Sequence, residues 1–290
     1  MKILEKSPKI TADLLYKAEA STGEGAIWHP GRNTLFWVDI EGKTLYEYFP
    51  KRRECYRRQF DKMVTTVVPE TENSVIVALQ NEIIRLNLET GDTDSLAFID
   101  DKNGTLRCND GKCDPQGRLW IGTMVLDAPP GTAALYTLLP DGKLKQQRDG
   151  ITISNGLGWS KDQRYFFYID TPTQKMERYL YNPETADIIE DGVVVEIPKC
   201  MGSPDGMTID AAGNLWVALW NGFGVHCYHP ATGELLMRVE LPVPNVTSCA
   251  FGGEELDTLY ITTARSGLST EELDKYPLSG SLFVCKPFEV

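Results

Sequence analysis

The amino-acid sequence predicts an all-β fold, a six-bladed β-propeller with four antiparallel strands in each blade. Three observations carry this prediction. Short apolar strings recur six times along the 290 residues, turn residues separate the strings, and no segment shows a helical pattern longer than two turns. With 42% hydrophobic residues, the chain can also build a large core. Because six units of similar length fill the chain without a linker, we expect residues 1–290 to form a single domain.

The recurring strings are the predicted second strand of each unit. They are rich in β-branched and aromatic residues and are bounded by Gly, Asp, Asn or Pro, which is typical of strands. Successive strings end 39 to 48 residues apart. The six strings are Leu35–Asp39, Ser74–Ala78, Arg118–Gly122, Phe166–Asp170, Asn214–Ala218 and Thr258–Thr262. Trp37, Trp120 and Trp216 occupy matching positions, so we expect these side chains in the core between blades.

The other strands of each unit flank the second one. A shorter first strand comes before it, as in Gly25–Trp28 and Gly156–Trp159. A third strand follows, as in Leu45–Tyr48, and a fourth closes most units, as in Val193–Ile197 and Leu235–Leu241. Four antiparallel strands repeated six times at this spacing are typical of a propeller.

The last unit lacks a fourth strand, because the chain ends at Val290 soon after the third. A spare strand precedes the first unit, at Asp13–Lys17. We expect it to complete the final blade, which would close the ring and cover two strand edges at once. Residues 269–274 predict one short helix inside a loop.

The charge of the chain excludes some classes of partner. Lys and Arg number 29 against 41 Asp and Glu, which gives a net charge of −12. Such a chain repels nucleic-acid phosphates and anionic lipids. No apolar run is long enough to span a membrane, and Met1–Pro8 lacks the apolar stretch of a secretory signal. We therefore expect a cytoplasmic protein that binds neither nucleic acid nor membrane; the pattern does not predict an oligomeric state.

The cysteines and histidines predict no site of their own. The seven cysteines are an odd number without a CxxC pair, so we expect reduced thiols that act as small buried apolar residues. His226 and His229 lie three apart on a predicted strand and cannot chelate together. We interpret these two and His29 as ordinary core or surface residues.

One polar residue begins the predicted first strand of every unit, 13 to 15 residues before the matching point of the second strand. The six residues are Glu24, Thr65, Asn109, Asn155, Asp205 and Ser248. The innermost strands of a propeller line its axis, so these side chains are expected to converge at one mouth. Carboxylate and amide oxygens there suit a hard divalent cation. Asp and Asn at a strand start can also be simple turn formers, but their common phase favours the cation site.

Seven short motifs in order resemble the regucalcin (senescence marker protein)/gluconolactonase family of six-bladed propellers, and the resemblance runs over nearly the whole chain. The motifs are Gly23–Gly25, Arg107–Lys112, Asp114–Arg118, Gly122–Met124, Ser154–Leu157, Pro204–Met207 and Thr247–Gly252. The resemblance implies a metal-dependent lactonase that opens sugar lactones to aldonic acids.

The resemblance also implies roles for five residues. Glu24, Asn155 and Asp205 would hold one divalent cation, with calcium, magnesium, manganese and zinc all open. Arg107 and Asn109 would contact the sugar lactone. The cation would polarise the lactone carbonyl and acidify a water, for which Asp205 is the expected general base.

The stretch after Gly122–Met124 departs from the family pattern. Many relatives have an acidic residue there that touches substrate hydroxyls, whereas this chain has Val-Leu before Asp127. The sugar preference therefore stays open, and gluconolactone is not assumed. Two other hypotheses remain: a calcium-binding regulatory protein without turnover, and a scaffold for protein interactions. A scaffold would need no polar axis, so the six aligned polar residues argue against it.

Overall fold

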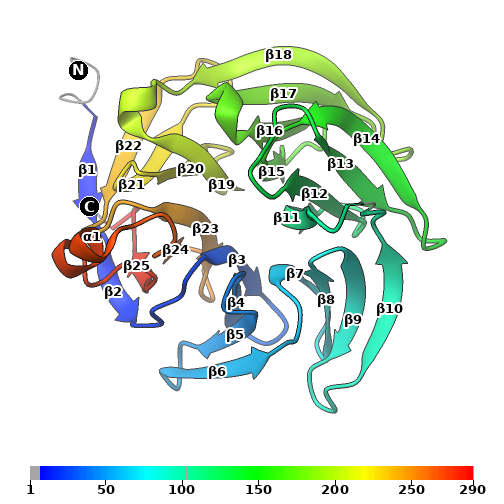
Figure 1. The fold of residues 1–290 in the computed structure, drawn as a ribbon. Helices are drawn as coiled ribbons and strands as arrows, with labels where there is room; N and C mark the ends of the chain where they lie inside the picture. Colours follow the sequence, from blue (N-terminus) through cyan, green and yellow to red (C-terminus); the bar gives the residue numbers. More distant parts are fainter. Residues whose placement is uncertain (1–6, 102, 290) are drawn as a thin grey trace.

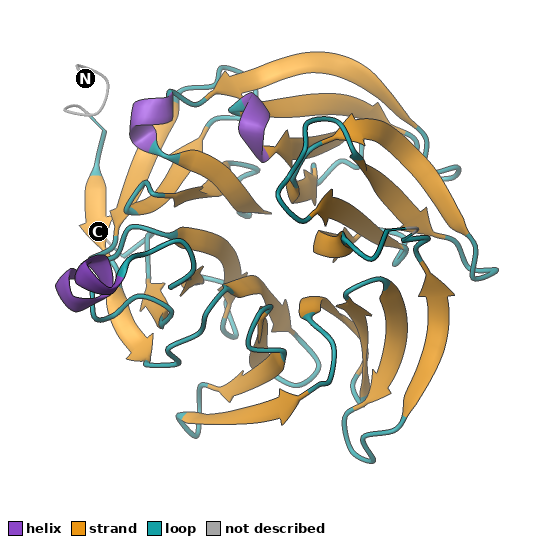
Figure 2. Ribbon diagram, viewed as in Figure 1, coloured by secondary structure: helices purple, strands orange, loops and turns teal. Residues whose placement is uncertain are grey.

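A computed structural model describes residues 7–101 and 103–289 of the chain. Six β-sheets are arranged around a common axis, and each sheet forms one blade of a six-bladed propeller, as predicted (Figure 1). Strands account for most of the ribbon, and helices are few and short (Figure 2). The interpretation of Met1–Pro8 as lacking a signal rests largely on residues outside the described part.

Each blade has an innermost strand, and the second strand of the blade follows it directly in the chain. The innermost strands are β3 (Gly23–His29), β7 (Val64–Thr71), β11 (Leu106–Cys113), β15 (Ser154–Trp159), β19 (Ser203–Ile209) and β23 (Val246–Gly252). The second strands are β4 (Thr34–Asp39), β8 (Ser74–Leu79), β12 (Leu119–Val125), β16 (Tyr165–Asp170), β20 (Leu215–Trp220) and β24 (Thr258–Thr263). The second strand of each blade overlaps one of the six predicted apolar strings.

The outer strands complete the blades. The third strands are β5 (Thr44–Phe49), β9 (Glu82–Asn87), β13 (Ala133–Leu138), β17 (Lys175–Tyr181), β21 (Gly224–Tyr228) and β25 (Leu282–Cys285). The fourth strands of the first five blades are β6 (Glu54–Gln59), β10 (Thr93–Phe98), β14 (Leu144–Ile151), β18 (Ile188–Glu196) and β22 (Leu235–Glu240). Within each of these blades, the innermost, second, third and fourth strands pair antiparallel with their neighbours.

The N-terminal segment closes the ring and contributes strands to two neighbouring blades. β2 (Asp13–Tyr16) pairs antiparallel with β25 and is the missing fourth strand of the last blade, which confirms the prediction. β1 (Lys9–Thr11) pairs parallel with β22 and adds a fifth strand to the neighbouring blade, which the sequence did not predict. Three residues with two exposed side chains carry no strand pattern, so only the tertiary structure reveals β1.

Three short helices lie in the connections of the described part of the chain. They are the 3-10 turns η1 (Thr171–Thr173) and η2 (Lys199–Met201) and the helix α1 (Thr270–Lys275). α1 confirms the predicted loop helix, and Ser269 and Glu272 form a reciprocal capping box at its start. Within the described residues, no helix has the length and apolar character needed to cross a membrane.

The core lies between neighbouring blades, and the three aligned tryptophans are fully buried in it, as predicted. Two of them repeat one polar contact. Trp120 donates through Nε1 to Asp114 Oδ2 at 3.1 Å, and Trp216 donates in the same way to Asp210 Oδ2 at 2.9 Å. In each case the carboxylate precedes the tryptophan by six residues, so the repeat conserves a buried hydrogen bond as well as a hydrophobic position.

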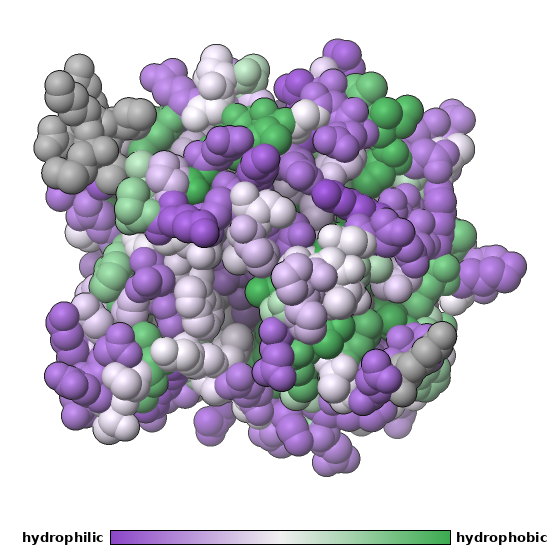
Figure 3. All heavy atoms as spheres, turned by 45° about the horizontal axis from the view of Figure 1, so that its top comes forward, coloured by the Kyte–Doolittle hydropathy of each residue, from purple (hydrophilic) through white to green (hydrophobic). Residues whose placement is uncertain are grey.

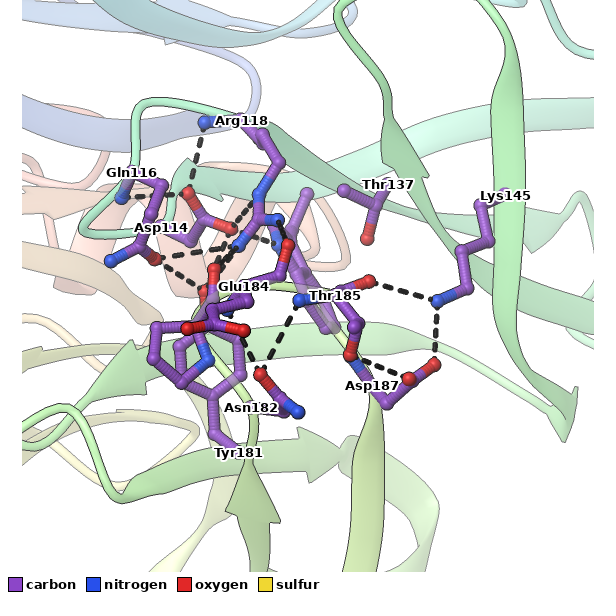
Figure 4. Close-up of polar contacts among 12 residues, drawn as sticks. Asp114, Gln116, Arg118, Thr137, Lys145, Tyr181, Asn182, Glu184, Thr185 and Asp187 are labelled. Atoms are coloured by element: carbon purple, nitrogen blue, oxygen red, sulfur yellow. Dashed lines mark hydrogen bonds and ion pairs between the residues drawn. The ribbon is translucent and has the colours of Figure 1, made fainter.

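Asp114 also joins the third blade to the fourth. Figure 4 shows Arg118 and Tyr181 directed at this carboxylate from two blades. Arg118 Nε donates at 2.7 Å, and the Tyr181 hydroxyl donates to Asp114 Oδ2 at 2.9 Å. The carboxylate side chain is fully buried, so these charge-assisted bonds compensate for its lost hydration.

All seven cysteines are free, as predicted, but only three of them, Cys108, Cys227 and Cys249, are buried. Cys55, Cys113 and Cys285 are partly buried. Cys200 is exposed on η2, which corrects the expectation of burial for that residue. His29 hydrogen-bonds Thr71 O at 2.9 Å.

Candidate functional site

The six aligned polar residues all lie among the first four residues of the innermost strands, at one end of the ring, as the phase of the repeat predicted. Each of them is buried: Glu24, Thr65, Asn109, Asn155, Asp205 and Ser248. Neighbouring innermost strands bond to one another at this level. Thr66 Oγ1 donates to Asn109 O at 2.5 Å, and Thr247 Oγ1 donates to Gly23 O at 2.6 Å across the closing blade. The described part of the chain therefore brings all of the predicted site residues to one mouth.

A break in strand register occurs at this level in every innermost strand. The pairing with the second strand shifts between Glu24 and Ile27, Val64 and Thr66, Cys108 and Gly111, Asn155 and Leu157, Pro204 and Met207, and Val246 and Ser248. A β-bulge redirects a side chain and is common beside active sites. The six register breaks therefore lie at or beside the six polar residues.

Glycines that follow site residues permit close packing of the innermost strands. A Cβ on Gly156 would lie 2.7 Å from Asp205 O, and one on Gly206 would lie 2.8 Å from Thr247 O. Gly25 has a φ of +61°, which side chains rarely adopt. In the Asn-Gly and Asp-Gly pairs, glycine is needed because a side chain would collide with the next innermost strand. In the Glu-Gly pair, it is needed because of the positive φ.

A chain of hydrogen bonds orients the amides of the site. Arg107 donates to Asn109 Oδ1 at 2.5 Å, and Asn109 Nδ2 donates to Asn155 Oδ1 at 3.0 Å. Asn155 Nδ2 then donates to Thr171 Oγ1 at 2.8 Å, and the Thr171 hydroxyl donates to Pro204 O, also at 2.8 Å. Thr171 therefore holds Asn155 with its oxygen turned away from η1, and the chain ends beside Asp205.

Two carboxyl groups face each other at the end of this chain. Glu24 and Asp205 are in direct side-chain contact. Burial, followed by the nearby charge of Asp110, raises the pKa of Glu24 to about 8. Burial and the charge of Glu24 raise the pKa of Asp205 well above its ordinary value. Two buried acceptors in contact require a proton or a cation between them.

Asp205 carries the clearest sign of an incomplete coordination shell. Its Oδ1 is buried and accepts no hydrogen bond from any N–H or O–H of the described residues. Glu24 Oε2 accepts the Gly25 N–H at 2.9 Å. Together with Asn155 Oδ1, these atoms form an all-oxygen set, which is the chemistry that hard divalent cations prefer. The residues present therefore fit a cation, although no group of three His, Cys, Asp or Glu gathers among residues 7–101 and 103–289.

Sequence reasoning missed two charged residues further along β11. Asp110 accepts the Gly111 N–H at 2.8 Å, and Lys112 Nζ donates to Met207 O across the axis, also at 2.8 Å. Burial raises the pKa of Asp110 and lowers that of Lys112, while the charge of each opposes the effect on the other. Two opposite charges on an innermost strand, in the Asn-Asp-Gly-Lys motif, were the available signal.

Hydrophilic residues cover much of the face shown in Figure 3, and apolar side chains form separate patches on it. Asp127, which the sequence analysis considered as a displaced acidic contact, is an exposed residue between β12 and β13 with a φ of +67°. The structure does not bring it into contact with Arg107 or Asn109 through any hydrogen bond among the described residues.

Comparison with known proteins gives the family of the chain. A model described as the SMP-30/gluconolactonase/LRE-like region matches residues 22–265. A Bacillus subtilis protein named as a sugar lactone lactonase, YvrE, is 37% identical over 264 residues, which cover 91% of this chain and 90% of that protein.

Two solved structures extend the likeness to three dimensions. A luciferin-regenerating enzyme has a TM-score of 0.87 and 34% identity, with 96% of each chain covered. A regucalcin from Agrobacterium tumefaciens, described as a calcium-binding protein, has a TM-score of 0.91 and 25% identity, with 96% of this chain and 94% of that chain covered.

Proposed function

This chain belongs to the SMP-30/gluconolactonase/LRE-like family, and on that premise we propose that it is a divalent-metal-dependent hydrolase that opens sugar lactones to aldonic acids. Membership of the family supports sugar-lactone hydrolase activity. The observation that carries the metal dependence is the buried Asp205 Oδ1, which has no N–H or O–H partner among the described residues and lies beside the Glu24 carboxyl.

Each site residue has a role that its contacts support. Glu24, Asn155 and Asp205 hold the cation, which supplies Lewis-acid polarisation of the lactone carbonyl when bound. Asp205 is the general base in this proposal: its carboxylate accepts a proton from the attacking water, which the amide of Asn155 cannot do. Arg107 donates charge-assisted hydrogen bonds to substrate oxygens, and Asn109 positions both Arg107 and Asn155.

The metal requirement is tested by chelation. We expect a chelator to abolish lactone opening in a pH-indicator assay, and we expect Mn²⁺, Zn²⁺, Mg²⁺ or Ca²⁺ to restore it to different extents. The assay should use a panel of aldonolactones, because the sequence leaves the sugar open. Full activity in a preparation shown by elemental analysis to be metal-free would remove the metal from the mechanism.

A second candidate function is calcium binding without turnover, which the calcium-binding description of the Agrobacterium regucalcin favours. The same panel distinguishes the two. Cation binding measured by calorimetry, together with no turnover on any lactone with any of the four ions, would establish the regulatory alternative.

Substrate and metal roles are separated by two alanine variants. Arg107→Ala is expected to raise KM about tenfold or more while the bound metal is retained, because Arg107 donates to Cys108 O and Asn109 Oδ1 and to no proposed cation ligand among the described residues. Asn109→Ala is expected to raise KM as well and to weaken metal binding moderately, because Asn155 Oδ1 loses its donor. Loss of metal in Arg107→Ala would show that this arginine supports the cation rather than the substrate.

A further inference from the structure

The connection between β4 and β5 places a carboxylate at the mouth that the roles above do not use. Glu41 lies two residues beyond Asp39, the last residue of β4. The Asp39 carboxylate accepts the N–H groups of Ser21 and Thr22 at 3.0 and 2.9 Å. These bonds hold the connection against the residues that lead into β3. Glu41 is therefore at the same end of the ring as Glu24.

One oxygen of the Glu41 carboxylate is anchored and the other is not. The Ser21 hydroxyl donates to Oε2, and Ser266 Oγ from the last blade lies 3.0 Å from the same oxygen. Oε1 has no hydrogen-bond partner in the described part of the chain, and the residue is exposed. The carboxylate is held in position with one strong acceptor left for a ligand.

The charge of Glu41 acts on the substrate-binding arginine. Burial lowers the pKa of Arg107, and the negative charges of Glu24, Glu41 and Asp205 oppose that effect. The connection between β4 and β5 and the first residues of β11 lie at the same end of their blades, because the innermost strands begin where the second strands end. The first and third blades thus present an acceptor and a donor at the same end of the ring.

We propose that Glu41 forms a subsite for the hydroxyl groups of a polyhydroxylated lactone, in which Oε1 accepts hydrogen bonds from the hydroxyls while Arg107 binds other substrate oxygens. This inference rests on the proposed lactone hydrolysis and adds a substrate class to it. A fixed carboxylate favours neutral lactones rich in hydroxyls. It disfavours lactones that carry a carboxylate of their own, because like charges repel.

The test compares three lactones in the metal-loaded full-length protein. Gluconolactone is neutral and hydroxylated, δ-valerolactone has no hydroxyls, and glucarolactone carries a free carboxylate. We expect Glu41→Ala to lower kcat/KM on gluconolactone about 10–100-fold, mainly through KM, since that is the worth of a hydrogen bond to a charged group. δ-Valerolactone should change by less than about twofold. Glu41→Gln should raise kcat/KM on glucarolactone about fivefold.

A matched control has the same change in charge away from the mouth. Glu255 is exposed in the turn between β23 and β24, at the other end of the blade, so Glu255→Gln should leave all three values unchanged. Equal losses on gluconolactone and δ-valerolactone, or no loss on either, would overturn the subsite while lactone hydrolysis stands. If the wild-type protein opens none of the three lactones, the proposed function and the subsite both fail.

Discussion

Asp205→Asn is expected to keep the fold and at least part of the bound metal, while kcat falls by roughly 10²–10⁴-fold, the usual contribution of a general base. The physical reason is that Asp205 has two roles in the proposed mechanism. As a ligand it needs an oxygen, which the amide of Asn also offers. As a base it needs a carboxylate, which the amide lacks. Metal stoichiometry and kcat on one lactone measure the two roles separately.

Three further variants sharpen this result. Asp205→Ala should lose the metal as well, and Asn155→Asp should tighten metal binding because it adds charge to the cation's ligands. Asp110→Asn is the matched control: it removes a nearby carboxylate that also acts on Glu24 and Asp205 but that we do not propose as a ligand. We expect it to keep kcat within about tenfold. If Asp205→Asn binds metal and retains more than about a tenth of wild-type kcat, Asp205 is a ligand only.

Deletion of residues 1–18 is expected to lower the free energy of unfolding by at least about 3 kcal/mol and the Tm by about 6–12 °C. The deletion removes β1 and β2 and exposes the edges of β22 and β25. It also removes Tyr16, whose ring packs edge-on against buried Trp37 with 6.1 Å between centroids. Thermal unfolding followed by circular dichroism measures the effect.

Two shorter deletions separate the contributions of the N-terminal strands. Deletion of residues 1–6 removes neither strand and serves as the control. Deletion of residues 1–11 removes only β1, so its effect should be smaller than that of the longest deletion. An unchanged Tm after deletion of residues 1–18 would show that ring closure by the N-terminal strand does not stabilise the fold.

The repeat could be predicted from sequence because its signal is local. Strings such as Leu35–Asp39 and Asn214–Ala218 combine β-branched and aromatic residues between turn residues, and their spacing is independent of any long-range contact. The missing fourth strand of the last unit and the spare Asp13–Lys17 also follow from counting strands. The six polar residues at the strand starts share one phase of the repeat, so their convergence followed from symmetry.

Contacts between blades were not predictable in this way. β1 pairs with β22 across more than 220 residues of sequence, and its three residues carry no pattern. The hydrogen bond from Asn155 to Thr171 depends on a 3-10 turn that lies beside Pro204 of the next blade. In the sequence, Glu41 has the pattern of an ordinary turn residue. Only in the closed ring does Ser266 of the last blade contact its carboxylate.

The sequence by itself determined the six-bladed repeat, its closure by Asp13–Lys17 and the identity of the polar residues at the axis, because strand and turn preferences act over a few residues and recur with the unit. Only the tertiary structure decided how those residues face one another. The register breaks beside the polar residues and the contact between Glu24 and Asp205 arise when six innermost strands meet around one axis. Such contacts join distant parts of the chain, and no local preference encodes them.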